Sequence, residues 1–272
     1  MTVEAWTWLG WVALGAAGAY ALLALALYLF QRKLIYAAGR QTAEPAPLAG
    51  RPPKILSVTA TDGTETQSWL WPAADPKKPL FILLQGNAGH IGHRLDCYGF
   101  LVEDGYGLAL VGYRGYGGHP GKPDEAGIVA DATAAVAAIR ARQPEARTLL
   151  FGESLGGAVA IALAAAGDTA PLILLGPFDR LASSAKARYP WMLIEPLLKE
   201  KWDSLERIGA VRQPLLWIHG ESDPVTPAAA GKRLFAAAPG PKADLVVPGG
   251  GHLGHLDEPE IRARFYDWVQ RV

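Results

Sequence analysis

The sequence Thr-Leu-Leu-Phe-Gly-Glu-Ser-Leu-Gly-Gly, at residues 148–157, decides how the rest of the chain is interpreted. Residues 148–151 form a short apolar run typical of a strand, and residues 158–166 are good helix formers. Between them, residues 152–156 read G-x-S-x-G at a strand-to-helix junction. A serine hydroxyl is a poor nucleophile at neutral pH, so it must be held at a fixed, exposed turn next to a base. The pattern favours Ser154 as a nucleophile over a glycine-rich turn without chemistry.

The charge balance and the cysteine content exclude several classes of protein. The 272 residues include 26 basic and 26 acidic side chains, so the chain carries no electrostatic footprint for nucleic acid. Cys97 is the only cysteine, which excludes an intrachain disulfide and a cysteine-rich metal site. The length fits one large domain with an appendage.

The N-terminal stretch is long and apolar enough to cross a membrane. Residues 5–30 carry no charge, and as a helix they would extend about 39 Å against a hydrocarbon core of about 30 Å. A cleaved signal peptide would begin with positive charge, whereas only Glu4 stands there. We predict a transmembrane helix over residues 5–31 and a single-pass membrane protein. Aromatic residues mark both ends of this span, as expected at the two interfaces: Trp6, Trp8, Trp11, Tyr28, Phe30 and Tyr36.

The charges after the span predict its orientation. Arg32, Lys33 and Arg40 all follow it, so the positive-inside rule places the C-terminal domain in the cytoplasm. Residues 32–54 are interpreted as a linker, because its second half is rich in Pro and Ala. In this interpretation the span contributes no strand, so we expect the domain to stay active without residues 1–40.

Residues 55–272 alternate between predicted strands and helices. Residues 55–60 and 66–71 alternate apolar and polar side chains around Asp62-Gly63, which indicates a hairpin. Helical stretches between the later strands imply an α/β fold with a mainly parallel sheet covered on both faces. Ligands bind such sheets outside the carboxyl ends of the strands. The expected later strands are residues 80–84, 108–111, 148–151, 172–175, 215–218 and 243–247.

Residues 177–212 are less regular and are predicted to form a short cap-like insert. The segment contains apolar residues that we expect to be exposed, among them Trp191, Met192, Leu197 and Trp202. Such residues either line a pocket for an acyl chain or complete the core over the sheet.

An activated serine needs a base, and the base needs an orienting carboxylate. The order serine, acid, histidine belongs with a G-x-S-x-G turn. Asp223 directly follows the strand expected at residues 215–218, so we favour it as the acid. Glu221 is an alternative, and so is Asp179, which follows an earlier strand.

His252 is the favoured base because it directly follows the last expected strand. Three glycines precede it, and they permit the close approach that a base on a loop needs. His255, three residues further on, is the main competitor, and His219 is expected to be structural. A metal site is disfavoured, because no carboxylate or cysteine at ligand spacing accompanies the histidines His90, His93 and His119.

The tetrahedral intermediate of acyl transfer needs backbone donors directed at its oxyanion. The amide of Leu155, just after the serine and at a helix N-terminus, is one candidate. The other is expected in the loop after residues 80–84, where Asn87 or Ala88 follows Gly86. The alternative interpretation of this loop is a flexible turn.

Several motifs occur in order along residues 80–272. They are Gly86-Asn87-Ala88-Gly89 followed by Ile91-Gly92-His93-Arg94, Tyr113-Arg114-Gly115-Tyr116-Gly117, Gly152-Glu153-Ser154-Leu155-Gly156-Gly157, Asp223 and Gly251-His252. With these motifs the chain resembles the α/β-hydrolase superfamily, and within it a membrane-anchored branch that includes protein depalmitoylases and lysophospholipases. The resemblance implies a triad of Ser154, Asp223 and His252, with Asn87 and Leu155 as oxyanion donors.

Two positions depart from the pattern of the family. Gln85 stands where such proteins usually have His before Gly-Asn, and Gly112 stands where an Asp usually precedes Tyr-Arg-Gly. Neither residue belongs to the triad, but Gln85 is placed to alter how the oxyanion loop is held.

The sequence therefore predicts a membrane-anchored serine hydrolase that cleaves esters or thioesters of small-molecule or lipid acyl substrates, without metal or organic cofactor. A serine peptidase or amidase would use the same residues. A non-catalytic, membrane-tethered binding module is the alternative from another class, although a binding module has no use for a complete triad.

Overall fold

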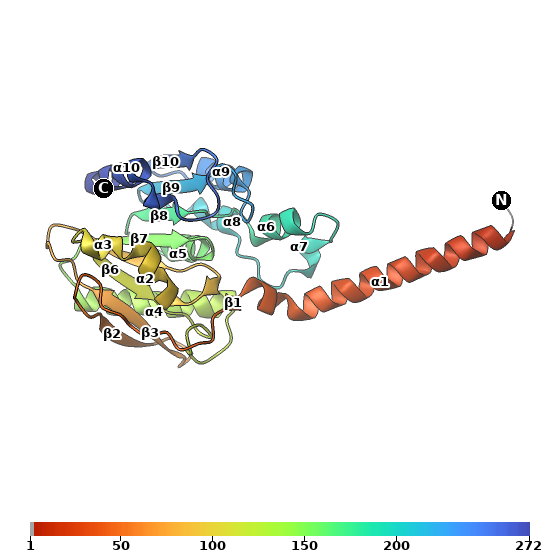
Figure 1. The fold of residues 1–272 in the computed structure, drawn as a ribbon, viewed down its shortest axis with the longest axis horizontal. Coiled ribbons are helices and arrows are strands. Elements are labelled where there is room, and N and C mark those ends of the chain that lie inside the picture. Colours follow the sequence, from red (N-terminus) through yellow and green to blue (C-terminus); the bar gives the residue numbers. More distant parts are fainter. Residues whose placement is uncertain (1–2) are drawn as a thin grey trace.

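A long helix, α1 (Val3–Ile35), leads into an eight-stranded sheet in the computed structural model, which describes residues 3–272 (Figure 1). The helix projects away from the sheet and its side chains are exposed over most of its length. Within the described residues, it is the one helix long and apolar enough to cross a membrane, with a mean hydropathy of 2.0 over Trp6–Ile35. Exposed apolar surface of this extent is typical of a segment that a bilayer covers.

The sheet has the strand order β10-β9-β8-β7-β4-β6-β3-β2. β2 and β3 form an antiparallel hairpin at one edge, and β3 also pairs antiparallel with β6. The remaining strands, in the order β6, β4, β7, β8, β9 and β10, are all parallel to one another. The predicted mainly parallel sheet is confirmed. Its strands are β2 (Lys54–Thr59), β3 (Glu65–Trp71), β4 (Leu80–Leu84), β6 (Gly107–Val111), β7 (Thr148–Glu153), β8 (Leu172–Leu175), β9 (Leu215–Gly220) and β10 (Lys242–Val247).

Helices cover both faces of the sheet because its central strands are apolar on both sides. β4, β6 and β8 are buried at every position, so each face needs its own cover. One face packs against α4 (Glu125–Arg142), α5 (Leu155–Ala165), α8 (Ser204–Ile208) and α9 (Ala228–Ala237). The other face packs against α2 (Arg94–Tyr98), α3 (Phe100–Glu103) and α10 (Pro259–Arg271).

The segment after β8 only partly matches the predicted insert. Its α6 (Leu181–Arg188) and α7 (Ile194–Leu197) lie beside the C-terminal part of α1 (Figure 1). Trp191 and Leu193 are exposed there, but Met192 and Trp202 are buried, contrary to the prediction. Trp202 is buried because it packs into the core and its indole Nε1 donates a hydrogen bond to the hydroxyl of Tyr36 at 2.9 Å.

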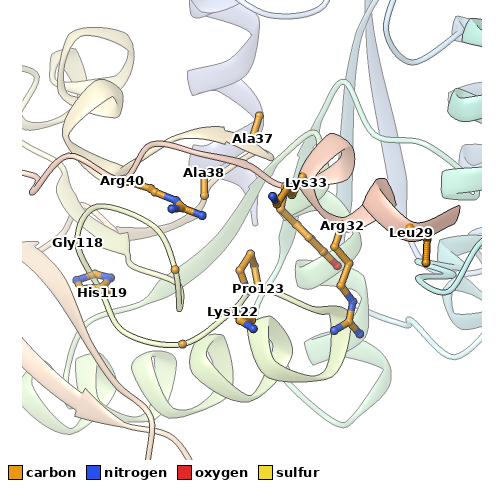
Figure 2. Close-up of a pocket in the computed structure, with 13 residues that line it drawn as sticks. Leu29, Arg32, Lys33, Ala37, Ala38, Arg40, Gly118, His119, Lys122 and Pro123 are labelled. Atoms are coloured by element: carbon orange, nitrogen blue, oxygen red, sulfur yellow. The ribbon is translucent and has the colours of Figure 1, made fainter. Parts of the chain in front are cut away.

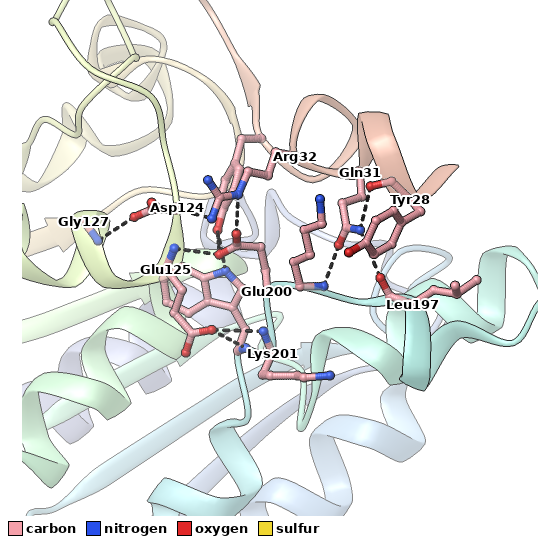
Figure 3. A network of polar contacts seen from close by, with 12 residues as sticks. Tyr28, Gln31, Arg32, Asp124, Glu125, Gly127, Leu197, Glu200 and Lys201 are labelled. Carbon is pink, nitrogen blue, oxygen red and sulfur yellow. Dashed lines mark hydrogen bonds and ion pairs between the residues drawn. The ribbon is translucent and has the colours of Figure 1, made fainter. Parts of the chain in front are cut away.

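The end of α1 is built into the domain, although the sequence predicted a linker there. Tyr36 is buried, and the short strand β1 (Ala37–Ala38) pairs in parallel with β5 (Ala88–Gly89). Figure 3 shows the neighbouring polar contacts, in which Arg32 Nε donates to Glu200 at 2.6 Å. Glu200 also accepts from the hydroxyl of Tyr36 at 3.0 Å. β1 therefore lies in the segment interpreted as a linker, and a deletion of residues 1–40 removes a paired strand together with the span.

Two N-terminal deletions distinguish the contribution of the span to stability from the contribution of the junction between α1 and the domain. Deleting residues 1–26 keeps Tyr36 and β1, whereas deleting residues 1–40 removes both and leaves buried Glu200 without two partners. We expect the longer deletion to lower the free energy of unfolding by about 3 kcal/mol or more relative to the shorter one. Urea denaturation in mild detergent, followed by circular dichroism, measures the difference. Equal stability of the two variants would show that the junction contributes nothing to the fold.

Candidate active site

Ser154 lies in a strained turn between β7 and α5. Its φ is 51° and its ψ is −112°, a conformation that costs a residue with a side chain about 1–3 kcal/mol. The turn is held by a hydrogen bond from Ser154 N to the carbonyl of Leu175 at 2.8 Å. A Cβ at Gly156 would overlap the carbonyl oxygen of Leu84, and one at Gly152 would overlap the first turn of α5. Glycine at these two positions therefore allows the turn to form.

His252 connects Ser154 to Asp223. Its Nε2 lies 3.0 Å from the Oγ of Ser154, and its Nδ1 lies 2.7 Å from Oδ2 of Asp223. An ionised carboxylate only accepts hydrogen bonds, so Nδ1 carries the proton and Nε2 is left to accept from the serine hydroxyl. Gly176 makes room for the ring, because a Cβ there would lie 3.1 Å from its Cε1 atom. The structure thus brings the three predicted residues together in the order that nucleophilic catalysis needs.

The Asp223 carboxylate is held ionised by its hydrogen bonds. Burial would raise its pKa, but hydrogen bonds from His252 and Thr226 outweigh burial and lower the pKa to about 2. Thr226 donates from both its Oγ1, at 2.7 Å, and its backbone N, at 2.9 Å, and Val225 N donates at 2.8 Å. The negative charge is therefore present at neutral pH and stabilises the imidazolium that proton transfer to His252 would form.

Behind Asp223 lies a buried network that the sequence did not reveal. Trp217 Nε1 donates to Nδ1 of His219 at 3.2 Å, so Nε2 of this histidine carries its proton. That nitrogen donates to the carbonyl of Thr226 at 2.9 Å and also lies 3.4 Å from Asp223 Oδ2. Burial lowers the pKa of His219 and favours its neutral form. His219 fixes the loop that carries the acid, and no sequence motif marks this role.

The rival residues lie elsewhere. His255 is buried against Gly250, and its Nε2 has no hydrogen-bond partner among residues 3–272. Asp179 pairs with Arg233 at 2.7 Å, and Glu221 is exposed. In the part of the chain that the structure describes, no three His, Cys, Asp or Glu side chains gather as metal ligands would.

Asn87 and Leu155 lie where backbone donors are expected. The side chain of Asn87 is engaged elsewhere, since its Nδ2 donates to the carbonyl of Ile35 at 2.8 Å. Its own carbonyl accepts from the hydroxyl of Tyr116 at 3.0 Å. Its backbone N–H has no hydrogen-bond partner within residues 3–272. Leu155 is the first residue of α5, so its N–H has no acceptor within the helix. The backbone amides, rather than side chains, are the groups available to an oxyanion.

Glu153 joins the serine turn to the loop that carries Asn87. Its buried carboxylate accepts from Arg94 Nη2 at 2.7 Å and from the hydroxyl of Tyr98 at 2.8 Å. Arg94 Nη2 also donates to the carbonyl of Ala88 at 3.1 Å. Gln85 does not share in this network, because its buried amide has no partner among the described residues. The loop is therefore held by Glu153 and Arg94, and the Gln85 amide adds no hydrogen bond to it.

Gly112, the second position that departs from the family pattern, is a glycine for a steric reason. A Cβ at Gly112 would overlap the carbonyl oxygen of Gln67, so no side chain fits there. His119 lies against the same position, accepting from Gln67 N at 3.1 Å through Nε2. Its Nδ1 then donates to the carbonyl of Tyr113 at 3.1 Å.

Comparisons with known proteins agree with this fold. A profile described as serine aminopeptidase, S33, matches residues 75–206, which include Ser154. An uncharacterized protein of Mycobacterium tuberculosis is 39% identical over 237 residues, or 85% of this chain and 82% of its own length. The lysophosphatidylserine lipase ABHD12 of Rattus norvegicus is 32% identical over 192 residues, or 63% of this chain and 48% of its own length. The chain belongs to the α/β-hydrolase superfamily.

A solved structure shows the same fold at low sequence identity. An esterase of Pyrococcus furiosus superposes with a TM-score of 0.69, covering 86% of this chain and 98% of the esterase, at 18% identity. This likeness concerns the α/β-hydrolase fold alone. Membership of the superfamily places the chain in a family of hydrolases.

The two neighbouring histidines give a matched test of the base. We expect His252→Ala to slow labelling of the protein by a fluorophosphonate about 10³-fold or more, because the serine loses its proton acceptor. His255→Ala removes a ring that packs against Gly250 and forms no hydrogen bond with Ser154, so labelling should change by less than about threefold. Thermal unfolding of both variants controls for loss of the fold. The reverse order of labelling rates would assign the base to His255.

Proposed function

We propose that the protein is a membrane-anchored serine hydrolase that cleaves carboxylic esters or thioesters of lipid-like acyl groups. The observation that carries the proposal is the hydrogen-bonded series from Ser154 through His252 to Asp223, beside two backbone donors. Each member has a role in acyl transfer that an ordinary structural network would not require.

In the proposed reaction, Ser154 Oγ attacks the acyl carbonyl carbon while His252 Nε2 takes the hydroxyl proton. The developing oxyanion accepts hydrogen bonds from the backbone amides of Asn87 and Leu155. His252 returns the proton to the departing alcohol or thiol, and the acyl group remains on Ser154. Water, deprotonated by His252, then releases the acid and regenerates the serine. The scheme uses no metal and no organic cofactor.

The proposed anchor is α1, with the hydrolase domain on the cytoplasmic side. The support is the length and exposure of α1, together with the positive charges of Arg32, Lys33 and Arg40 at its C-terminal end. An anchored enzyme meets membrane-bound substrates at a raised local concentration without needing any new contact.

The tip of the insert supports a substrate that resides in the membrane. Trp191 packs edge-on against Tyr20 of α1 with ring centres 6.3 Å apart, and Leu193 N donates to the Tyr20 hydroxyl at 3.4 Å. Tyr20 precedes Ile35 by 15 residues, or about 22 Å of helix, so the tip reaches the depth of the proposed hydrocarbon layer. Trp191 and Leu193 are 55% and 66% exposed, as suits residues that contact lipid.

An apolar cavity of about 90 Å³ lies between α1 and the insert. It offers a surface on which an acyl chain can leave the bilayer without meeting water. The activity of the lysophosphatidylserine lipase among the relatives points to the same class of substrate. The residues around this cavity include Leu27, Tyr28, Leu34, Tyr189, Met192 and Leu197.

Replacing the nucleophile tests the reaction class. We expect Ser154→Ala to reduce ester hydrolysis about 10⁴- to 10⁶-fold and to abolish fluorophosphonate labelling, because Ser154 carries the hydroxyl at His252 Nε2. The other nearby hydroxyl, that of Thr226, lies at Nδ1 and donates to Asp223. Ser57→Ala, an exposed serine on β2, is the matched control and should keep both activities. A variant at residue 154 that retains more than about a tenth of the wild-type rate would rule out this nucleophile.

A series of acyl esters tests the substrate class. Each CH₂ that becomes buried contributes about 0.8 kcal/mol, so kcat/KM should rise up to about fourfold per carbon until the apolar surface is filled. The measurement is kcat/KM in detergent micelles for esters of about two to sixteen carbons, with matched amides alongside. A preference for acetyl esters would contradict the lipid assignment. Faster cleavage of the amides would favour the serine peptidase that the family profile suggests.

A further inference from the structure

A large cavity opens beside the C-terminal end of α1, apart from Ser154. Its volume is about 830 Å³, and its walls come from the last turns of α1, from β1, and from the loop at residues 115–123 (Figure 2). None of the residues that line it belongs to the candidate triad. The proposed hydrolase reaction therefore does not explain this cavity.

The charged side chains around the cavity are all basic. Arg32, Lys33, Arg40 and Lys122 line it, and none of its lining residues is acidic. Arg32 forms ion pairs with Glu200 at 2.6 Å and with Asp124 at 3.6 Å, so its charge is neutralised. The other three cations form no ion pair with any residue that the structure describes. A chain with 26 basic and 26 acidic residues thus gathers three unpaired positive charges at one opening.

These cations come from different segments that the fold brings together. Lys33 lies on α1, Arg40 follows β1, and Lys122 lies on the loop after β6 (Figure 2). All three side chains are exposed, so solvent screens their mutual repulsion, and an anion in the cavity would interact favourably with each of them. A phosphate group accepts hydrogen bonds from both lysine and arginine, and an arginine can bind it through two N–H groups.

The walls of the cavity are fixed before any ligand binds. Arg114, at the start of the loop, is held by Asp131 at 2.7 Å and by Asp62 at 2.6 Å. Within the loop, Gly115 N donates to the carbonyl of Pro120 at 3.0 Å, and Gly117 N donates to that of Gly39 at 2.7 Å. A preformed site loses little conformational entropy on binding.

The position of the cavity indicates the source of the anion. Leu29, Arg32 and Lys33 belong to the last two turns of α1, where the proposed span ends. Lipid headgroups lie at that level, and basic residues next to a span are attracted to the anionic leaflet. We propose that this cavity binds the phosphate-bearing headgroup of an anionic bilayer lipid. The proposal rests on the membrane anchor and is independent of the hydrolase reaction.

Native mass spectrometry of the full-length protein in neutral detergent tests the proposal. The probes are a short-chain phosphatidylglycerol, the matching phosphatidylcholine, and soluble glycerol phosphate. We expect the wild-type protein to bind phosphatidylglycerol at least about tenfold more tightly than phosphatidylcholine. Glycerol phosphate should bind more weakly than phosphatidylglycerol, because it lacks the chains that keep the headgroup at the end of α1.

Two triple variants locate the site. Lys33→Gln, Arg40→Gln and Lys122→Gln together should weaken phosphatidylglycerol binding about tenfold or more. The control combines Lys54→Gln, Lys77→Gln and Lys232→Gln, which are exposed, lie outside the cavity and remove the same charge. The control should bind within about twofold of the wild type.

Three outcomes would overturn the proposal. The first is an equal loss of phosphatidylglycerol binding in both triple variants, which would show that binding depends on the net charge of the protein and not on this cavity. The second is equal affinity for the two lipids in the wild type. The third is glycerol phosphate binding as tightly as phosphatidylglycerol, which would make the cavity a site for soluble phosphates. The experiment measures lipid binding and not ester hydrolysis. A protein that binds phosphatidylglycerol but hydrolyses no ester would contradict the proposed function alone, and one that hydrolyses esters but does not bind the lipid would contradict the headgroup site alone.

Discussion

The contact between Gly156 and the carbonyl oxygen of Leu84 is the constraint on which the candidate site depends. It brings the first turn of α5 directly against the end of β4, and no residue with a Cβ fits at that position. Ser154 leaves the end of β7 and Asn87 leaves the end of β4, so the same contact sets how far the nucleophile lies from the second backbone donor. The positive φ of Ser154 follows from this packing, and the sheet around it supplies the energy that holds the strained turn.

The second constraint comes from outside the sheet, at the end of α1. Asn87 is held on one side by Tyr116 and on the other by the carbonyl of Ile35, the last residue of the helix. The next residues form β1 and pair with β5, which directly follows Asn87. The loop that we propose as the source of an oxyanion donor is therefore positioned by the proposed anchor as well as by the hydrolase core. An anchor joined by a flexible linker would have left this loop with fewer contacts.

Strong local signals account for what the sequence predicted correctly. The apolar runs predicted the strands. Asp223 and His252 were expected near one another because parallel strands bring their carboxyl ends to one edge, and the structure places their side chains 2.7 Å apart. Roles that depend on long-range contacts were missed. Nothing local marks His219 as the support of the acid loop, and nothing in residues 32–40 reveals a partner strand about 50 residues away. Trp202 was expected to be exposed, because only the fold shows that Tyr36 lies beside it.

The joint between α1 and the domain gives the two proposals a common physical basis. β1 is at once a wall of the basic cavity and the pairing partner of the strand beside Asn87. Lys33 precedes β1 and Arg40 follows it, so a headgroup bound by both residues would hold the chain at both ends of the strand and restrict the motion of the strand. In the proposed reaction the N–H of Asn87 would stabilise an oxyanion only while it points at the reacting carbonyl, since such donors act by being oriented in advance. If both proposals hold, the bilayer would help to hold the catalytic geometry as well as the substrate, because the anchor, the cavity and the proposed oxyanion loop share one short strand.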